Sequence, residues 1–416
     1  MPNDRVTDSD VVVIGAGAAG CAAAIALRHK GLCVVLLERA PSQARFCGEF
    51  VSGETRGALA QLGLSASLAA LGANPIRRLE LHAVSGGCFS LSLSAGGFGL
   101  TRRTLDWALL GRAVQDGAML FARMHVNAVW GGPGRGFRVE AIADGERGHV
   151  FSARAVIGAH GKRSAVDRAL GRRFHPLNSE WVGVRKHYRG VDRGDAVALY
   201  LFPGGYCGAV SAEDGLTTLA LLAGRRALKE CGDRPDGLIE RARVCNPGLR
   251  AWLDRAVAVP DSLRAISRIS FAPKEPVVQG VFLAGDSAGV TAPFLGIGVA
   301  NALGSALACA DAVGRWLEGS IDFEQARHDY ERWWRRGRQV RGLSRPASSV
   351  LCHAATGNFA VWLLNRVPWA AEAVYRASRV HMPTSSVRRT VTDSRVTNLT
   401  EPCREAELRE SSKAHR

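Results

Sequence analysis

The sequence predicts an α/β fold made of a discontinuous parallel-sheet domain, a second domain built on an antiparallel sheet, and a helical C-terminal region. Buried strands followed by glycine-rich turns, at 10–20 and 281–298, indicate the parallel sheet. Alternating polarity within 79–93 and 196–222 indicates the antiparallel sheet. The boundaries that we expect are 8–75, 100–172 and 268–345 for the first domain, 76–99 and 173–267 for the second, 346–382 for the helical region, and 383–416 for a disordered tail.

Composition bounds the class of protein. The 416 residues are 47% hydrophobic and 22% charged, as in globular chains long enough for two domains. Lys and Arg outnumber Asp and Glu by 54 to 38, yet aromatic side chains do not interleave with the basic ones, so we expect no nucleic-acid partner. The ten cysteines lack the close spacing of zinc sites, and we expect no metal. The acidic, apolar-poor start predicts no signal peptide, hence a cytoplasmic protein with reduced thiols.

The first motif is a glycine fingerprint between a strand and a helix. Residues 10–14 are apolar, 15–20 read Gly-Ala-Gly-Ala-Ala-Gly, and 21–29 predict a helix rich in alanine. In this pattern the glycines allow a tight turn, the approach of a pyrophosphate, and close packing of helix on strand, while the helix N-terminus attracts the phosphates. The residues expected to contact a dinucleotide are Gly15, Gly17, Ala18, Ala19 and Gly20.

A second predicted strand, 34–37, ends at Glu38. A carboxylate about twenty residues beyond the glycines is placed to accept hydrogen bonds from the adenosine ribose. We include the next residue, Arg39, in the candidate cofactor site. The chain contains one such fingerprint, so we expect one dedicated dinucleotide, a Rossmann-bound FAD or NAD.

The C-terminal half favours FAD. A buried strand at 281–284 ends in Gly285 and Asp286, and an acid at that position can bond the ribitol hydroxyls of a flavin. A helix that begins near Gly296 would direct its N-terminal dipole at the isoalloxazine and stabilise the charge of reduced flavin. Pro293 and Gly298 complete the candidate turn. The uncharged stretch 287–310 contains several glycines and polar residues, and we interpret it as a buried loop and helix rather than a membrane span.

A third turn lies between these two, at 155–164. The three motifs, in this order, resemble those of the flavoprotein superfamily that contains aromatic hydroxylases related to 4-hydroxybenzoate hydroxylase, flavin-dependent halogenases and geranylgeranyl reductases. There the middle motif reads G-A-D-G, whereas this chain has His160 at the acidic position. The resemblance implies bound FAD, a Rossmann-like domain, and NAD(P)H as a transient reductant in the manner of single-component flavin monooxygenases.

Further segments narrow the resemblance. Residues 46–52 are similar to the C-G motif of geranylgeranyl reductase-like proteins, and 202–208 to their P-G-G-Y segment. Residues 99–106 resemble the element in which an Arg lies beside the cofactor. This similarity implies that Cys47, Gly48 and Arg102 adjoin the flavin.

Four residues are candidates for catalysis. Cys47 is either a proton donor or a small apolar filler. Glu49 is either a general acid with a pKa raised by burial, or a surface or Arg-paired carboxylate. His187 and Tyr206 either orient a phenol or carbonyl of the substrate, or pack with one satisfied hydrogen bond. Glu213, at a hairpin turn, is expected to be solvated.

The function that the sequence predicts is an FAD-dependent monooxygenase of secondary metabolism. It would oxygenate an aromatic or polyketide-like small molecule through a flavin peroxide adduct. The alternative is a flavin-dependent reductase of carbon–carbon double bonds in an isoprenoid or polyene chain. A halogenase is less favoured, because the W-x-W-x-I-P segment of tryptophan halogenases is absent and no lysine matches their catalytic one. A flavin-holding protein that only binds a partner is a further alternative.

Beyond residue 323 the sequence predicts a helix with Tyr330, Trp333 and Trp334 on one stripe among arginines. It is either a packing helix with a solvated basic side, or a surface that meets an acidic carrier protein or an anionic membrane.

Overall fold

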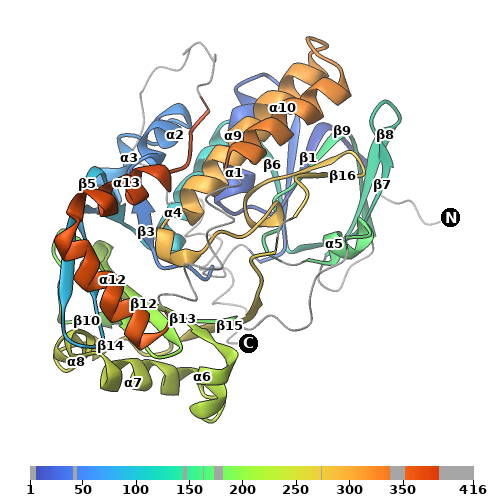
Figure 1. Ribbon diagram of the computed structural model, residues 1–416. Coiled ribbons are helices and arrows are strands. Elements are labelled where there is room, and N and C mark those ends of the chain that lie inside the picture. The colour runs from blue at the N-terminus through green and yellow to red at the C-terminus, as the bar shows by residue number, and fades with distance from the viewer. Residues whose placement is uncertain are drawn as a thin grey trace.

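The computed structural model describes residues 6–40, 45–143, 148–162, 164–172, 181–272, 274–337 and 352–383. Two large sheets lie side by side, with helices on their outer faces (Figure 1). This arrangement confirms the predicted α/β class. The predicted tail falls almost wholly outside the described residues.

The first sheet has eight strands and a parallel core, in the order β16-β17-β9-β1-β2-β6, with β7 and β8 joined to it through β9. Neighbouring strands come from distant parts of the chain, because β1 pairs with β9 and β9 pairs with β17. The bounds are β1 Val6–Ile14, β2 Val34–Glu38, β6 Met119–Ala122, β7 Met124–Gly132, β8 Gly136–Ala143, β9 Gly148–Gly158, β16 Val277–Val278 and β17 Val281–Leu283.

Both faces of the first sheet are covered, so its central strands are apolar on both sides. Side chains of β1 alternate between two cores: Val11 and Val13 pack with the helices, and Val12 and Ile14 pack against the β7–β8 hairpin and α5. The helices of this part are α1 Ala18–Arg28, α2 Thr55–Gln61, α3 Ser67–Ala70, α4 Arg102–Gln115, α5 Ala165–Ala169, α9 Gly298–Leu317 and α10 Phe323–Arg336.

The second sheet has nine strands in the order β14-β10-β13-β12-β11-β4-β5-β3, with β15 beside β10. All pairings are antiparallel except that of β11 with β4. Its bounds are β3 Phe50–Ser52, β4 Asn74–His82, β5 Cys88–Gly99, β10 Trp181–Arg189, β11 Ala196–Phe202, β12 Gly205–Ser211, β13 Thr217–Gly224, β14 Val257–Ala258 and β15 Arg264–Ile269. Strand β3 therefore joins the second sheet, although its residues fall in the segment assigned to the first domain.

Strands β11, β12 and β13 are buried on both faces, whereas their alternation predicted half-buried strands. On one face Cys207 packs with Trp252 under α6 Arg225–Glu230, α7 Pro235–Cys245 and α8 Pro247–Leu253. On the other face Tyr206 packs with residues of the 290–294 loop and of the C-terminal helices, α12 Ala354–Arg366 and α13 Pro368–Ala377. The C-terminal helices are therefore the outer cover of the sheet (Figure 1).

Helix α10 packs against the first domain. Tyr330 and Trp334 are buried and Trp333 is half-buried, and the Tyr330 hydroxyl donates a hydrogen bond to the carbonyl of Leu283. Exposed Arg335 pairs with Glu331 on the outer side. The aromatic stripe is thus the inner face of a packing helix. Of the helices in the described ranges, α9 included, none is both long and apolar enough to cross a membrane.

Candidate functional site

The first glycine turn is closed by the other two. Gly15 has φ +103°, and a Cβ there would lie 2.5 Å from the carbonyl oxygen of Ala159 in the middle motif. A Cβ on Gly20 would lie 1.7 Å from the Gly15 oxygen, so helix α1 can approach β1 only with glycine at that position. A Cβ on Gly285, in the third motif, would be 3.0 Å from that of Ala19. Three segments distant in sequence therefore meet at one place.

The N-terminus of α1 is built to receive an anion. Gly17 is the N-cap and supplies no side-chain oxygen to the first turn, where Ala18 and Ala19 are buried. The Arg45 guanidinium lies over Gly17, since Cζ would be 3.2 Å from a Cβ at that position. Helix dipole, unpaired amides and guanidinium together form the donor set that a pyrophosphate requires.

Glu38 lies at the end of β2, beside this turn. Its carboxylate accepts hydrogen bonds from the Ala16 amide at 2.7 Å, the Ala40 amide at 2.8 Å, and Arg45 Nη2 at 2.7 Å. Burial alone would raise the pKa of Glu38, but Arg45 and the two amides outweigh it and leave the pKa below its usual range. The carboxylate is ionised and fixed next to the turn, while Arg39 is exposed.

The third turn also ends in an uncapped helix. Gly285 begins it with φ +63°, and half-buried Asp286 follows. Pro293 opens a short 3₁₀ turn, Gly296 has φ +65°, and α9 begins at Gly298 without a side-chain cap. A Cβ on Gly296 would be 2.7 Å from the ring of Phe50. The N-termini of α1 and α9 thus belong to the same group of turns, which is the arrangement an elongated dinucleotide needs.

The middle turn departs from the family pattern in a way that the structure explains. His160 Nε2 lies 3.2 Å from the buried carboxylate of Asp167, which also pairs with Arg172 at 2.7 Å. The Gly161 amide donates a hydrogen bond to Ser287 Oγ of the third motif. Asp167, which caps helix α5, therefore lies beside His160. His160 occupies the position where the family motif has an aspartate.

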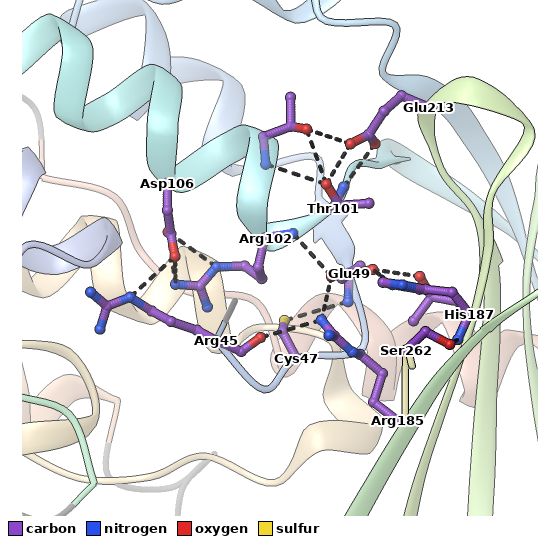
Figure 2. Close-up of polar contacts among 12 residues, drawn as sticks. Arg45, Cys47, Glu49, Thr101, Arg102, Asp106, Arg185, His187, Glu213 and Ser262 are labelled. Atoms are coloured by element: carbon purple, nitrogen blue, oxygen red, sulfur yellow. Dashed lines mark hydrogen bonds and ion pairs between the residues drawn. The ribbon is translucent and has the colours of Figure 1, made fainter. Parts of the chain in front are cut away.

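Cys47, Gly48 and Arg102 come together between the two sheets. Half-buried Cys47 accepts a long hydrogen bond from the Glu49 amide, with 3.4 Å between nitrogen and Sγ. Arg102 pairs with Asp106 at 2.9 Å, and Asp106 also pairs with Arg45. Figure 2 shows Arg45, Asp106 and Arg102 in one network, which reaches Cys47 through Glu49.

Glu49 is the most enclosed of the candidate catalytic residues. It is 0% exposed, and its backbone adopts φ +61°. Arg185 Nη1 donates to it at 2.8 Å, Thr218 Oγ1 donates at 2.5 Å, and His187 Nε2 lies 2.8 Å from its second oxygen (Figure 2). The Arg102 amide completes the shell at 3.1 Å.

Of the two alternatives for Glu49, the structure has the Arg-paired carboxylate and not the acid with a raised pKa. Burial does raise the pKa of this carboxyl, but the hydrogen bond and charge of His187, followed by Arg185 and Thr218, lower it further and leave it below its usual range. Glu49 is an ionised, Arg-paired carboxylate. The sequence contains no distinct signal of this partner, because Arg185 is followed in the same strand by Lys186, His187 and Arg189.

His187 and Tyr206 project from the face of the second sheet that meets the first domain. His187 points with Arg185 toward Glu49, opposite to Tyr188, as strand alternation predicts. Tyr206 is 3% exposed and contacts Phe294 edge-on, with 6.2 Å between ring centroids. Burial raises the pKa of Tyr206 well above its usual value, so the phenol stays protonated.

Glu213, expected in solvent, is buried. It accepts hydrogen bonds from the amide and hydroxyl of Thr101 and from Thr104 Oγ1, and so joins the start of α4 to the second sheet (Figure 2). Its partners lie more than a hundred residues earlier, at separations of 112 and 109, and no local pattern reveals them.

Converging glycine turns, two uncapped helix termini and a second, adjoining sheet define a flavoprotein with a Rossmann-type FAD site. The FAD binding domain family matches residues 10–52. A relative from Methanopyrus kandleri, digeranylgeranylglycerophospholipid reductase 2, is 30% identical over 331 residues, which cover 75% of this chain and 78% of the relative. The chain is an FAD-dependent oxidoreductase and belongs to the superfamily of 4-hydroxybenzoate hydroxylase and geranylgeranyl reductase-like proteins.

Solved structures with this fold differ in their chemistry. The flavin-dependent brominase Bmp2 has a TM-score of 0.77 with 19% identity, and the match covers 98% of this chain and 100% of that one. The protein PqsL of Pseudomonas aeruginosa, described as a probable FAD-dependent monooxygenase, has a TM-score of 0.72 with 18% identity, over 86% of this chain and 100% of that one. At these identities the likeness concerns the fold alone.

Proposed function

We propose that the chain is a monooxygenase that uses FAD and NAD(P)H to oxygenate an aromatic or polyketide-like small molecule. Bound FAD would supply the redox chemistry, by accepting hydride and then passing electrons to dioxygen. The residues to hold it are those of the three turns, with Glu38 at the ribose and the helix N-termini at the anionic groups. The remaining question is what this chain's own side chains contribute.

The observation that carries the proposal is the state of Glu49. Reduction of a carbon–carbon double bond needs a group that delivers a proton to carbon, and Glu49 is, with Cys47, one of two candidate proton donors. Its carboxylate instead is ionised, fully buried, and engaged by Arg185, His187 and Thr218. The Glu49 carboxylate holds the strand that follows Cys47 in place. While Arg185, His187 and Thr218 bind it, it has no proton to deliver to a substrate carbon.

The wall of the second sheet supports an aromatic substrate. Next to the Glu49 network, Tyr206, Leu222 and Phe294 form an apolar cluster on the same face. A protonated phenol in apolar surroundings can donate one hydrogen bond to a phenolic or carbonyl oxygen and so orient the ring. Apolar walls also exclude water, which an oxygenating site requires to avoid losing its reducing equivalents.

The second candidate, a reductase of double bonds, is favoured by Cys47. Its thiol lies beside Arg102 and next to the Glu49 amide, in the segment that resembles geranylgeranyl reductases. A thiol there could supply the proton that Glu49 cannot. The 30% identical relative is named as a reductase, which supports this candidate from sequence.

Halogenation receives less support. The brominase Bmp2 shares the fold, but Lys186, the one lysine in the described strands, does not face Tyr206. Lys186 follows Arg185 on β10, so it points to the opposite face, where its Nζ lies 6.0 Å from the centroid of the Tyr188 ring.

The test is the fate of labelled dioxygen. The FAD-loaded protein is incubated with NADPH or NADH and a panel of phenols, polyketide-like ketones and isoprenoid alkenes, under ¹⁸O₂ and with bromide and chloride present. Mass spectrometry of the products then separates the three chemistries. We expect a product that contains one ¹⁸O atom. A product that gains two hydrogens, or a halogen, would overturn the proposal.

Cys47→Ala is the matched variant for this assay. If the chain is a monooxygenase, this variant still forms the ¹⁸O-labelled product, because Cys47 carries no proton in that reaction. Loss of a two-hydrogen product in Cys47→Ala, with FAD content unchanged, would instead identify the reductase.

A further inference from the structure

The C-terminal helices carry an exposed aromatic patch. We define it as Phe359, Trp362 and Leu363 on α12, whose exposed fractions are 59%, 52% and 41%; on the next helix, α13, Trp369 and Val374 are also exposed, at 73% and 65%. The other large apolar side chains that are exposed in the described residues are scattered over the fold. Clustered exposure of this kind marks an interaction surface rather than ordinary surface composition.

The two helices hold this patch outward because their other faces are used for packing. Val361 and Leu364 of α12, with Ala371 of α13, belong to the apolar cluster on the second sheet. The outward residues of α12 recur at helical spacing, and Phe359 and Trp362 stack with 5.6 Å between ring centroids. The two helices thus carry apolar residues on their inner side and on their outer side, and Figure 1 shows them lying on the second sheet.

The charged groups around the patch are mostly basic. The Arg366 guanidinium lies 5.1 Å from the centre of the Trp362 ring, and Arg376 pairs with Glu372 at the edge of the patch. The whole chain carries a net charge of +16. A basic rim around exposed tryptophans matches the surface of an anionic bilayer, in which aromatic rings enter the headgroup region and cations meet lipid phosphates.

We propose that the aromatic patch docks onto an anionic lipid bilayer, with α12 and α13 lying in the plane of the interface. An acidic carrier protein would be recognised mainly by cations, whereas here the centre of the patch is apolar and the arginines stand at its edge. The proposed contact is peripheral, with α12 and α13 on the bilayer surface; none of the described helices could cross a membrane.

Docking there has a consequence for substrate entry, which rests on the proposed function. The inner faces of the same helices contact the cluster that contains Tyr206. One helical layer therefore separates the bilayer from the candidate substrate wall. A substrate dissolved in the bilayer would reach this wall without first being extracted into water.

The test is sedimentation of the FAD-loaded protein with vesicles of phosphatidylcholine, with and without about a third phosphatidylglycerol. The test variant carries Phe359→Ser, Trp362→Ser and Trp369→Ser together. The control is Trp130→Ser, because Trp130 on β7 is also 52% exposed but lies far from α12 in the sequence and in the other sheet. Because all the replaced side chains are exposed, we expect both variants to have the FAD content and the thermal unfolding midpoint of the wild type.

We expect the wild type and Trp130→Ser to sediment with vesicles, and more strongly with the anionic ones. The triple variant should bind about a thousand-fold more weakly, since each of the three inserted aromatic side chains contributes roughly ten-fold. A wild type that stays in the supernatant, or a triple variant that binds as the wild type does, would overturn the proposal. So would a dimer that the triple variant converts to a monomer without any vesicle binding.

A second measurement does not depend on affinity. Brominated lipids quench tryptophans that contact acyl chains. Trp362→Phe/Trp369→Phe keeps the patch apolar, so this variant should still bind vesicles but lose the quenching seen in the wild type. Equal quenching in both proteins would show that other tryptophans meet the lipid and would refute the assignment. Neither assay uses catalysis, so their failure is separate from failure of the proposed function.

Discussion

Replacing Glu49 should destabilise the fold more than replacing any exposed carboxylate. Glu49→Ala leaves Arg185, which is 3% exposed, without its partner, and the loss of one member of a buried ion pair costs about 3–5 kcal/mol. Domains of ordinary stability have about 5–15 kcal/mol in total, so this variant can fail to fold. Glu49→Gln keeps the shape and part of the hydrogen bonding, and we expect a loss of about 2–3 kcal/mol.

The assay is urea unfolding of the FAD-loaded protein at neutral pH. A double-mutant cycle with Arg185→Met isolates the pair, for which we expect a coupling free energy of about 1–3 kcal/mol. The matched control is Asp195→Asn, in the turn just before β11 of the second sheet, because Asp195 pairs with exposed Arg78. We expect no measurable change there. A Glu49→Gln variant within about 0.5 kcal/mol of the wild type would refute the account of this network.

The same pair predicts a pH dependence with a definite sign. The pKa of Glu49 is lower in the folded state than its usual value of about 4.3. Its contribution to stability is therefore complete above that value and is lost as the pH falls through the lowered folded pKa. As the pH falls below about 4, the free energy of unfolding should decrease less in Glu49→Gln than in the wild type, because the glutamine has no charge to lose. Parallel acid unfolding curves would contradict this.

Three further changes test the cofactor site and its support. Gly20→Ala would place a Cβ 1.7 Å from the Gly15 oxygen, so we expect a protein that purifies without yellow colour. Glu38→Ala should weaken FAD retention by about 1–3 kcal/mol, measured as the dissociation constant by flavin fluorescence. Tyr330→Phe removes the hydrogen bond to the Leu283 carbonyl, and we expect about 1 kcal/mol less stability by thermal unfolding.

Each of these has its own control. Gly31→Ala changes a glycine with φ +79° and no neighbour within 4 Å, so it separates backbone strain from the steric clash at Gly20. Glu38→Gln separates charge from shape, and an FAD affinity equal to that of the wild type in Glu38→Ala would remove Glu38 from the site. For Tyr330, unchanged stability would show that water replaces the lost partner.

Local pattern was sufficient for the parts of the fold that rest on neighbouring residues. The first strand, glycine turn and helix were expected at 10–14, 15–20 and 21–29, and the structure has β1 at Val6–Ile14 and α1 at Ala18–Arg28. The signal is strong there because the apolar run, the three glycines and the alanines all favour one conformation. Alternation along β10 also explains why His187 and Tyr188 lie on opposite faces.

The same pattern could not reveal how Glu49 is paired. Its partners Arg185, His187 and Thr218 lie 136, 138 and 169 residues further along the chain. Whether a buried carboxyl gains or loses a proton depends on these charges, and they become neighbours only when β10 and β13 meet the segment after Cys47. The half-buried expectation for β11–β13 was wrong for a related reason, because the cover on their second face comes from the 290–294 loop and the C-terminal helices, which lie far away in the sequence.

The strand order of the first sheet bears on how the protein matures in the cell. Strand β9 pairs with β1 across some 140 residues of chain, and the Gly-Asp turn follows only after β17, which ends at Leu283. About two thirds of the polypeptide must therefore be synthesised before all three turns of the FAD site are present. Until then the early strands expose apolar edges, and chaperones or free FAD would determine how many nascent chains reach the native state.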